Sequence, residues 1–137
     1  MVSRARPLAI AMMAAASCGG ASDTVSDPVS GTAMLLAVQA QVFTPRCALS
    51  GCHVGTTAPF GLDLGSVSAS AASLVGVPSG EMAGLKRVAP GDAANSYLYW
   101  KLSGNPSING DPMPASGGPL SGADLSLIAS WIDGGAK

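Results

Sequence analysis

Apolar residues near the middle of the chain's first half recur at helical spacing. Leu35, Val38 and Val42 fall at i, i+3 and i+7 within residues 34–43, which is the pattern of a helix with one buried face. Pro45 comes soon after. Because proline lacks a backbone N–H and disfavours helical conformation in the residue before it, we expect this helix to end there.

The clearest helix is predicted at the other end of the chain. Ser121 is followed three positions later by Asp124, and this pairing is a capping box that begins a helix. Gly134 and Gly135 would end it. The apolar face of this helix is formed by Leu125, Ile128, Trp131 and Ile132.

A shorter helix is expected around Leu98 and Leu102, which lie four positions apart on one face. Asp92 or Asn95 would cap its start, since short polar side chains accept hydrogen bonds from the first free backbone N–H groups. Gly104 would end it.

Small and turn-forming residues fill most of the remaining chain. Residues 67–76 are compatible with a short helix of small side chains, and residues 105–120 form a loop rich in Gly, Asn and Pro. At 137 residues, with 18 Gly, 10 Pro and only 4% aromatic residues, the chain has one domain and a thin core. We therefore expect an all-α fold of small helices and long loops.

The N-terminus has the pattern of an export signal. Arg4 and Arg6 precede a short apolar stretch, residues 7–16, and small residues then lead to Cys18. This arrangement resembles a bacterial lipobox, in which the cysteine carries lipid, although Ala15 stands where the usual leucine would be. The alternative is an ordinary secretory signal in which Cys18 is incidental.

These features predict three segments. Residues 1–17 are expected to be a lipoprotein signal peptide, residues 18–33 a flexible tether and residues 34–137 the folded domain. The protein would be exported and anchored to a membrane through Cys18, in the periplasm or on the outer surface. The formal net charge of −1, without a stripe of Lys or Arg, gives no indication of nucleic-acid binding.

The only histidine, His53, directly follows Cys52, and Cys47 stands five residues before Cys52. A cysteine pair that ends in Cys-His is how a chain attaches a c-type haem. Two thioether bonds hold the macrocycle, and the imidazole becomes an iron ligand. The usual motif has two residues between the cysteines, whereas residues 48–51 make four here. We expect these residues to bulge, with Gly51 providing the freedom to do so.

Two other interpretations of the cysteines remain open. In an oxidising compartment Cys47 and Cys52 could form a disulfide in a haem-free binding or structural module. A zinc site is a weaker alternative, because Cys47, Cys52 and His53 supply three ligands without a clear fourth. Enzymatic catalysis fits poorly, since there is no second histidine and no Ser-His-acid set.

A haem held by His53 needs a second axial partner, and without another histidine this would be Met, Lys, Tyr, water or nothing. The sequence offers three methionines after the signal segment. Met34 lies in the expected first helix, and Met82 lies in a Gly-rich loop. Met113 lies between Pro112 and Pro114 in the loop before the last helix. Because the two prolines stiffen that loop, they would hold the thioether sulfur at a fixed place. Met113 is therefore the favoured ligand and Met82 the second candidate.

Together these features resemble a class I cytochrome c domain, and more closely the exported, lipobox-bearing cytochrome c-like domains with expanded cysteine spacing. The resemblance covers residues 34–136 and rests on Phe43 to Cys47, Cys52-His53, Gly61 to Leu64, Arg87 to Asp92, Ser96 to Leu98, Lys101-Leu102, Met113-Pro114 and Leu125 to Ile132.

The resemblance implies a cytochrome c-like fold around one haem c, covalently bound to Cys47 and Cys52, with His53 as proximal and Met113 as distal iron ligand. It also implies an electron-transfer protein rather than an enzyme. Its partners would be redox proteins, and no small-molecule substrate is expected.

Overall fold

The computed structural model describes residues 28–137. The export signal, Cys18 and residues 19–27 of the expected tether lie outside the described residues. Helix α1, Pro28–Val38, begins the described part and runs directly into a π-helix, η1, Gln39–Cys47. Residues 28–33, which the sequence assigned to the tether, are therefore helical. Gly31 in this turn packs against Lys137, so closely that a Cβ on Gly31 would lie 2.6 Å from Cβ of Lys137.

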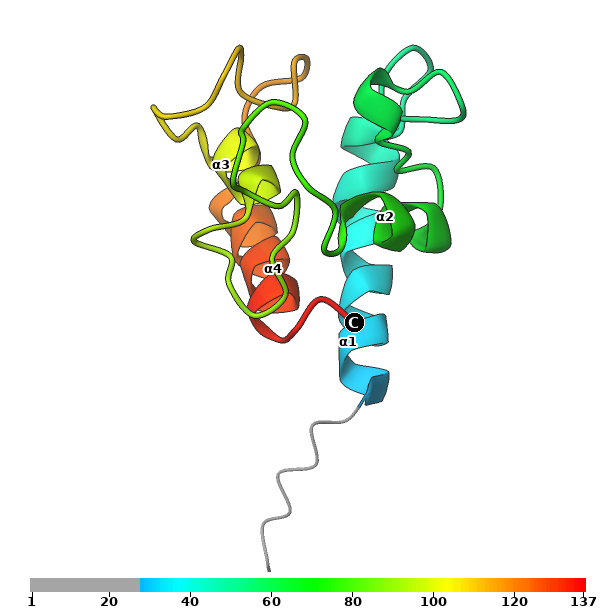
Figure 1. Ribbon diagram of the computed structural model, residues 1–137. Helices are drawn as coiled ribbons and strands as arrows, with labels where there is room; N and C mark the ends of the chain where they lie inside the picture. The colour runs from blue at the N-terminus through cyan, green and yellow to red at the C-terminus, as the bar shows by residue number, and fades with distance from the viewer. Residues whose placement is uncertain (1–27) are drawn as a thin grey trace, which may run out of the picture.

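The predicted helical stripe is buried. Leu35 is 2% exposed, and Val38 and Val42 are fully buried, whereas Leu36 on the neighbouring face is 53% exposed. Burial of this face against the domain stabilises the helix far more than its intrinsic propensity does. The stripe therefore sets how the long α1–η1 helix lies against the rest of the chain (Figure 1).

The expected helix end at Pro45 is wrong. The helix continues through Pro45 to Cys47 because its last turns are π-helical. In such a turn each N–H bonds the carbonyl five residues back, as the Ala48 amide does to the Phe43 carbonyl at 2.7 Å. This wider turn accommodates the proline, and it directs the Cys47 side chain into the core, where Cys47 is 8% exposed.

Helix α4, Gly122–Asp133, packs against α1. The capping box at its start is confirmed: the Ser121 hydroxyl accepts from the Asp124 amide, and the Asp124 carboxylate accepts from Ser121. Trp131 is fully buried and meets the edge of Phe43 at 6.3 Å between ring centroids. This aromatic pair joins the two long helices at the centre of the core.

Two short helices and one turn complete the helical elements. Helix α2, Val67–Leu74, confirms the helix expected from residue 67, and the Ser66 hydroxyl caps it by accepting from the Ala69 amide. The turn η2, Pro59–Gly61, is a 3₁₀ helix. Helix α3, Tyr97–Ser103, lies beside α4 (Figure 1).

The caps expected for α3 are wrong at its start and correct at its end. Ser96 occupies the N-cap position without capping the helix, and its hydroxyl instead donates to the Asp92 carbonyl and accepts from the Ala89 amide. Asp92 accepts from the Asn95 amide and so closes the preceding turn. Gly104 ends the helix in the left-handed conformation, as predicted.

The segment between α2 and α3 is held by isolated β-bridges rather than by a sheet. Val75 pairs with Val88, and Lys86 pairs with both Pro78 and Ser96. Within residues 28–137 the regular structure is therefore mainly helical, joined by long loops. Among those residues, no helix has the length and apolar character that a membrane span requires.

Candidate functional site

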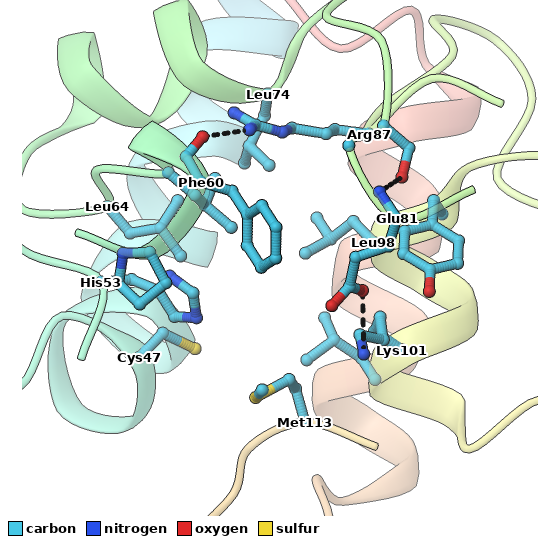
Figure 2. Close-up of a pocket in the computed structure, with 16 residues that line it drawn as sticks. Cys47, His53, Phe60, Leu64, Leu74, Glu81, Arg87, Leu98, Lys101 and Met113 are labelled. Atoms are coloured by element: carbon cyan, nitrogen blue, oxygen red, sulfur yellow. Dashed lines mark hydrogen bonds and ion pairs between the residues drawn. The ribbon is translucent and has the colours of Figure 1, made fainter. Parts of the chain in front are cut away.

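An apolar pocket lies between the loop that follows η1 and the segments around α3 (Figure 2). Cys47 and His53 lie on one wall, and Met113 and Lys101 lie on the opposite wall. The space between the walls amounts to about 820 Å³ with its open mouth included. The other lining residues are Pro59, Phe60, Leu62, Leu64, Leu74, Ser79, Gly80, Glu81, Arg87, Tyr97, Leu98 and Leu102.

The expanded cysteine motif closes into a compact loop at the end of η1. The His53 amide donates to the Cys47 carbonyl at 3.1 Å, and the Cys52 amide donates to the Leu49 carbonyl at 2.9 Å. Gly51 adopts φ 79°, the left-handed region that favours glycine. The expected bulge of residues 48–51 is thus confirmed, and it brings His53 back to Cys47 across five intervening residues.

The two cysteines of the motif differ in exposure. Cys47 is buried on the pocket wall, whereas Cys52 is exposed and lies outside the pocket lining. Burial raises the pKa of the Cys47 thiol to about 11, the Arg46 charge opposes the rise, and the nearby Cys52 adds to it. Both thiols are free. The motif therefore holds one thiol inside the pocket and one at its outer side.

His53 places its ring on the pocket wall with one nitrogen withdrawn from solvent. Its Nδ1 is buried and makes no hydrogen bond within residues 28–137. Burial lowers the pKa of His53; the Leu62 backbone opposes that shift, and the Arg87 charge adds to it. The ring is therefore held as neutral imidazole, the form that binds metals. The Pro59 carbonyl, on the same pocket lining, is not the partner of Nδ1 and accepts from the Leu62 amide at 3.1 Å.

Met113 is the methionine that reaches the pocket, and its sulfur points into the space toward the His53 wall (Figure 2). The Met113 amide donates to the Lys101 carbonyl at 2.9 Å, which ties the loop to α3. Met82 is not among the pocket residues, and Met34 packs on the hydrophobic core near α4. Of the three candidate methionines, Met113 alone lies across the pocket from His53.

Leucine side chains form part of the pocket wall. Leu62, Leu64 and Leu98 line the pocket. Trp100 does not, because it turns away and its indole Nε1 donates to the Ala94 carbonyl. Leu62 and Leu64 follow η2, whereas Leu98 lies in α3, so the pocket is formed by the tertiary fold rather than by one motif.

Sequence reasoning missed the polar residues of the pocket and one aromatic residue. Phe60 is 67% exposed at φ 56°, and its ring projects into the mouth of the pocket (Figure 2). Arg87 fixes this turn by donating to the carbonyls of Phe60 and Ser73. Lys101 forms an ion pair with Glu81 at 2.9 Å. No local sequence pattern marks these residues, because their partners lie far along the chain.

The donor set and the pocket fit a c-type haem. An imidazole and a thioether face each other across an apolar space, which is the ligand pair of electron-transferring cytochromes. A thiol lies beside the imidazole, and a second thiol follows within the same loop. Within residues 28–137, no group of three or more His, Cys, Asp or Glu side chains gathers as a site for a metal ion.

Comparison with known proteins finds no family model, no curated protein and no solved structure that matches the chain. The functional interpretation consequently depends on the geometry of the pocket and on the motif that forms it.

Proposed function

We propose that the protein is a single-electron carrier with one covalently bound haem c, held on a cytochrome c-like fold. The observation that carries this proposal is the placement of His53 and Met113 on opposite walls of one apolar pocket. Bound there, the haem would supply a one-electron redox centre.

Each residue of the site has a distinct part in this function. Cys47 and Cys52 would hold the macrocycle through thioether bonds, one from inside the pocket and one from its outer side. His53 and Met113 would both bind the iron. With these two protein ligands engaged, the site would have no open place for a substrate, which favours electron transfer over catalysis.

The apolar walls would exclude water from the ligands. Leu64 is 2% exposed, and Leu74 is fully buried on the same wall. Such surroundings would help to set the reduction potential of the bound iron, because burial and dielectric are among the factors that determine that potential. Redox proteins would be the partners, and the exposed side at Cys52 and Phe60 is where they could approach the cofactor.

The proposal extends to the place of action. Export and lipid attachment at Cys18 would put the carrier in the periplasm or on the outer surface, tethered to a membrane. The support is the signal pattern of residues 1–17, which lies outside the described residues.

The experiment is a potentiometric titration of protein produced together with a c-type haem maturation system. We expect a reversible titration with the slope of a one-electron couple, and no binding of carbon monoxide to the reduced form, since His53 and Met113 would both bind the iron. A haem protein that binds carbon monoxide readily and turns over a small-molecule oxidant would contradict the carrier function.

A further inference from the structure

The pocket wall opposite His53 contains a buried charge. Lys101 is 9% exposed, although its ammonium group lies on the lining of an apolar pocket. Burying a charge costs free energy unless the charge is paired and hydrogen-bonded, and an apolar residue of similar size is often no worse for stability. A lysine at this place therefore calls for an explanation beyond packing.

The ammonium group of Lys101 has three protons, and each has an acceptor. Nζ lies 2.9 Å from the Glu81 carboxylate, and it donates to the Asn109 carbonyl at 2.7 Å and the Asp111 carbonyl at 3.0 Å. Glu81 belongs to the segment before α3, whereas Asn109 and Asp111 belong to the loop that carries Met113. One side chain thus joins two long loops across the pocket wall.

The backbone of the same residue also binds this loop. The last carbonyls of a helix have no partner within the helix, and the Lys101 carbonyl, in the last turn of α3, accepts the Met113 amide at 2.9 Å. Lys101 therefore contacts residues 109, 111 and 113 of one loop, through its side chain at the first two and its backbone at the third. Figure 2 shows Lys101 and Met113 on the same wall, with Glu81 above them.

Three neighbouring contacts strengthen this arrangement. The Tyr97 hydroxyl accepts from the Asn109 amide at 3.1 Å, and the Asn109 side chain donates to the Glu81 carbonyl. On the far side of the loop, Arg46 donates to the Gly118 carbonyl at 2.7 Å and so ties the loop to the end of η1. The loop is therefore bound on both sides of Met113.

We propose that Lys101, with Glu81 as its counter-charge, is a positioning residue that holds the Met113 thioether toward the pocket. This inference rests on the proposed function for the identity of the group that Met113 binds. We call the contacts of Lys101 with Glu81 and with residues 109, 111 and 113 the clamp. The clamp belongs to the polypeptide and can be measured without the cofactor.

The first test uses hydrogen exchange in the haem-free protein. Lys101→Met keeps the length of the side chain and removes its three bonds. We expect the Met113 amide to exchange about tenfold faster or more, since hydrogen bonds to a charged group are stronger than those between neutral groups and their loss would let the loop open locally. Lys86→Met is the matched control, because Lys86 is exposed and its ammonium has no bond in the part of the chain that the structure describes.

The second test uses the haem-loaded variants, with covalent haem first established by mass. Lys101→Met should retain covalent haem but lose much of the far-red thioether–iron absorption band and show a lower reduction potential, whereas Lys86→Met should match the wild type. If Lys101→Met gives too little protein, Glu81→Gln is measured instead and should show the same losses in smaller measure.

The results separate the two proposals. A wild-type exchange rate, band and potential in the Lys101→Met or Glu81→Gln variant would overturn the clamp while leaving the haem assignment intact. A lower unfolding midpoint with an unchanged band and potential would reduce Lys101 to a structural role and would also overturn the clamp. A protein without haem would contradict the proposed function, and the exchange measurement would still decide the clamp.

Discussion

The His53 amide donates to the Cys47 carbonyl at 3.1 Å, so that the first and last residues of the C-x4-C-H segment meet. The four residues between the cysteines do not stretch the motif, because the turn at Leu49–Cys52 and the positive φ of Gly51 fold them outward. The extra length is thus taken up away from the pocket. The imidazole and the Cys47 thiol stay on one wall of it.

Met113 and Met82 are predicted to differ in their effect on the haem. Met113→Ala should make the ferric haem high-spin or water-ligated, remove the far-red sulfur–iron band, lower the reduction potential and admit cyanide quickly, because Met113 lies across the pocket from His53. Met82→Ala should change none of these, since Met82 is not on the pocket lining. Absorption spectra of both variants show which substitution removes the far-red band. Loss of the band in Met82→Ala alone would identify the other methionine as the ligand.

The two motif cysteines are predicted to react at different rates in the haem-free protein. Burial raises the pKa of the Cys47 thiol to about 11, and alkylating reagents attack the thiolate, so Cys47 should react slowly, whereas Cys52 is exposed. We expect Cys52 to be alkylated faster by on the order of a hundredfold near neutral pH. Peptide mapping after a short pulse of iodoacetamide, in a Cys18→Ser background, measures the difference. Equal labelling of the two cysteines would show that Cys47 is accessible.

Trp131 is predicted to be the core side chain that contributes most to the free energy of unfolding. It lies on α4, is fully buried and packs against Phe43 of η1, so Trp131→Ala should lower the free energy of unfolding by about 3–5 kcal/mol. Trp131→Phe should cost much less, because it keeps the aromatic contact with Phe43 and removes an indole N–H that has no partner within residues 28–137. Urea unfolding measures both variants. Leu36→Ala, at a 53% exposed position, is the control with little expected change.

Cys18 is predicted to be the lipid-bearing mature N-terminus. Cys18→Ser should release the protein from the membrane fraction, because the lipid chains would be its anchor. Fractionation and N-terminal sequencing of both forms test this. A Cys18→Ser protein that stays with the membrane and keeps its N-terminus would rule out the anchor without affecting the haem site.

Local patterns predicted the long elements well, for reasons that the structure makes plain. The stripe of Leu35 and Val38 is buried because a 3.6-residue period leaves it on one face of α1, and the Ser121–Asp124 capping box depends only on residues three apart. In both cases the determining interactions lie within a few residues of one another. The flanking prolines also pointed to Met113, which lines the pocket, but its place there depends on contacts with Lys101 as well.

What the sequence did not reveal depends on distant contacts. The helix passes through Pro45 because η1 takes the wider π spacing and buries Cys47 in the core, and this tertiary gain outweighs the local preference to stop. The ion pair of Lys101 with Glu81 joins residues twenty positions apart, and a lysine in a short helix predicts only a solvated face. The unequal exposure of Cys47 and Cys52 likewise follows from how η1 lies against the core.

The intact mass of the protein, produced with a c-type haem maturation system and denatured before measurement, tests the central claim most directly. We predict a mass increase of one haem, attached at Cys47 and Cys52. Cys47→Ser or Cys52→Ser should leave at most one thioether, and the double variant should carry no denaturant-resistant haem. A wild-type protein that contains an intact Cys47–Cys52 disulfide and no haem mass would contradict the account.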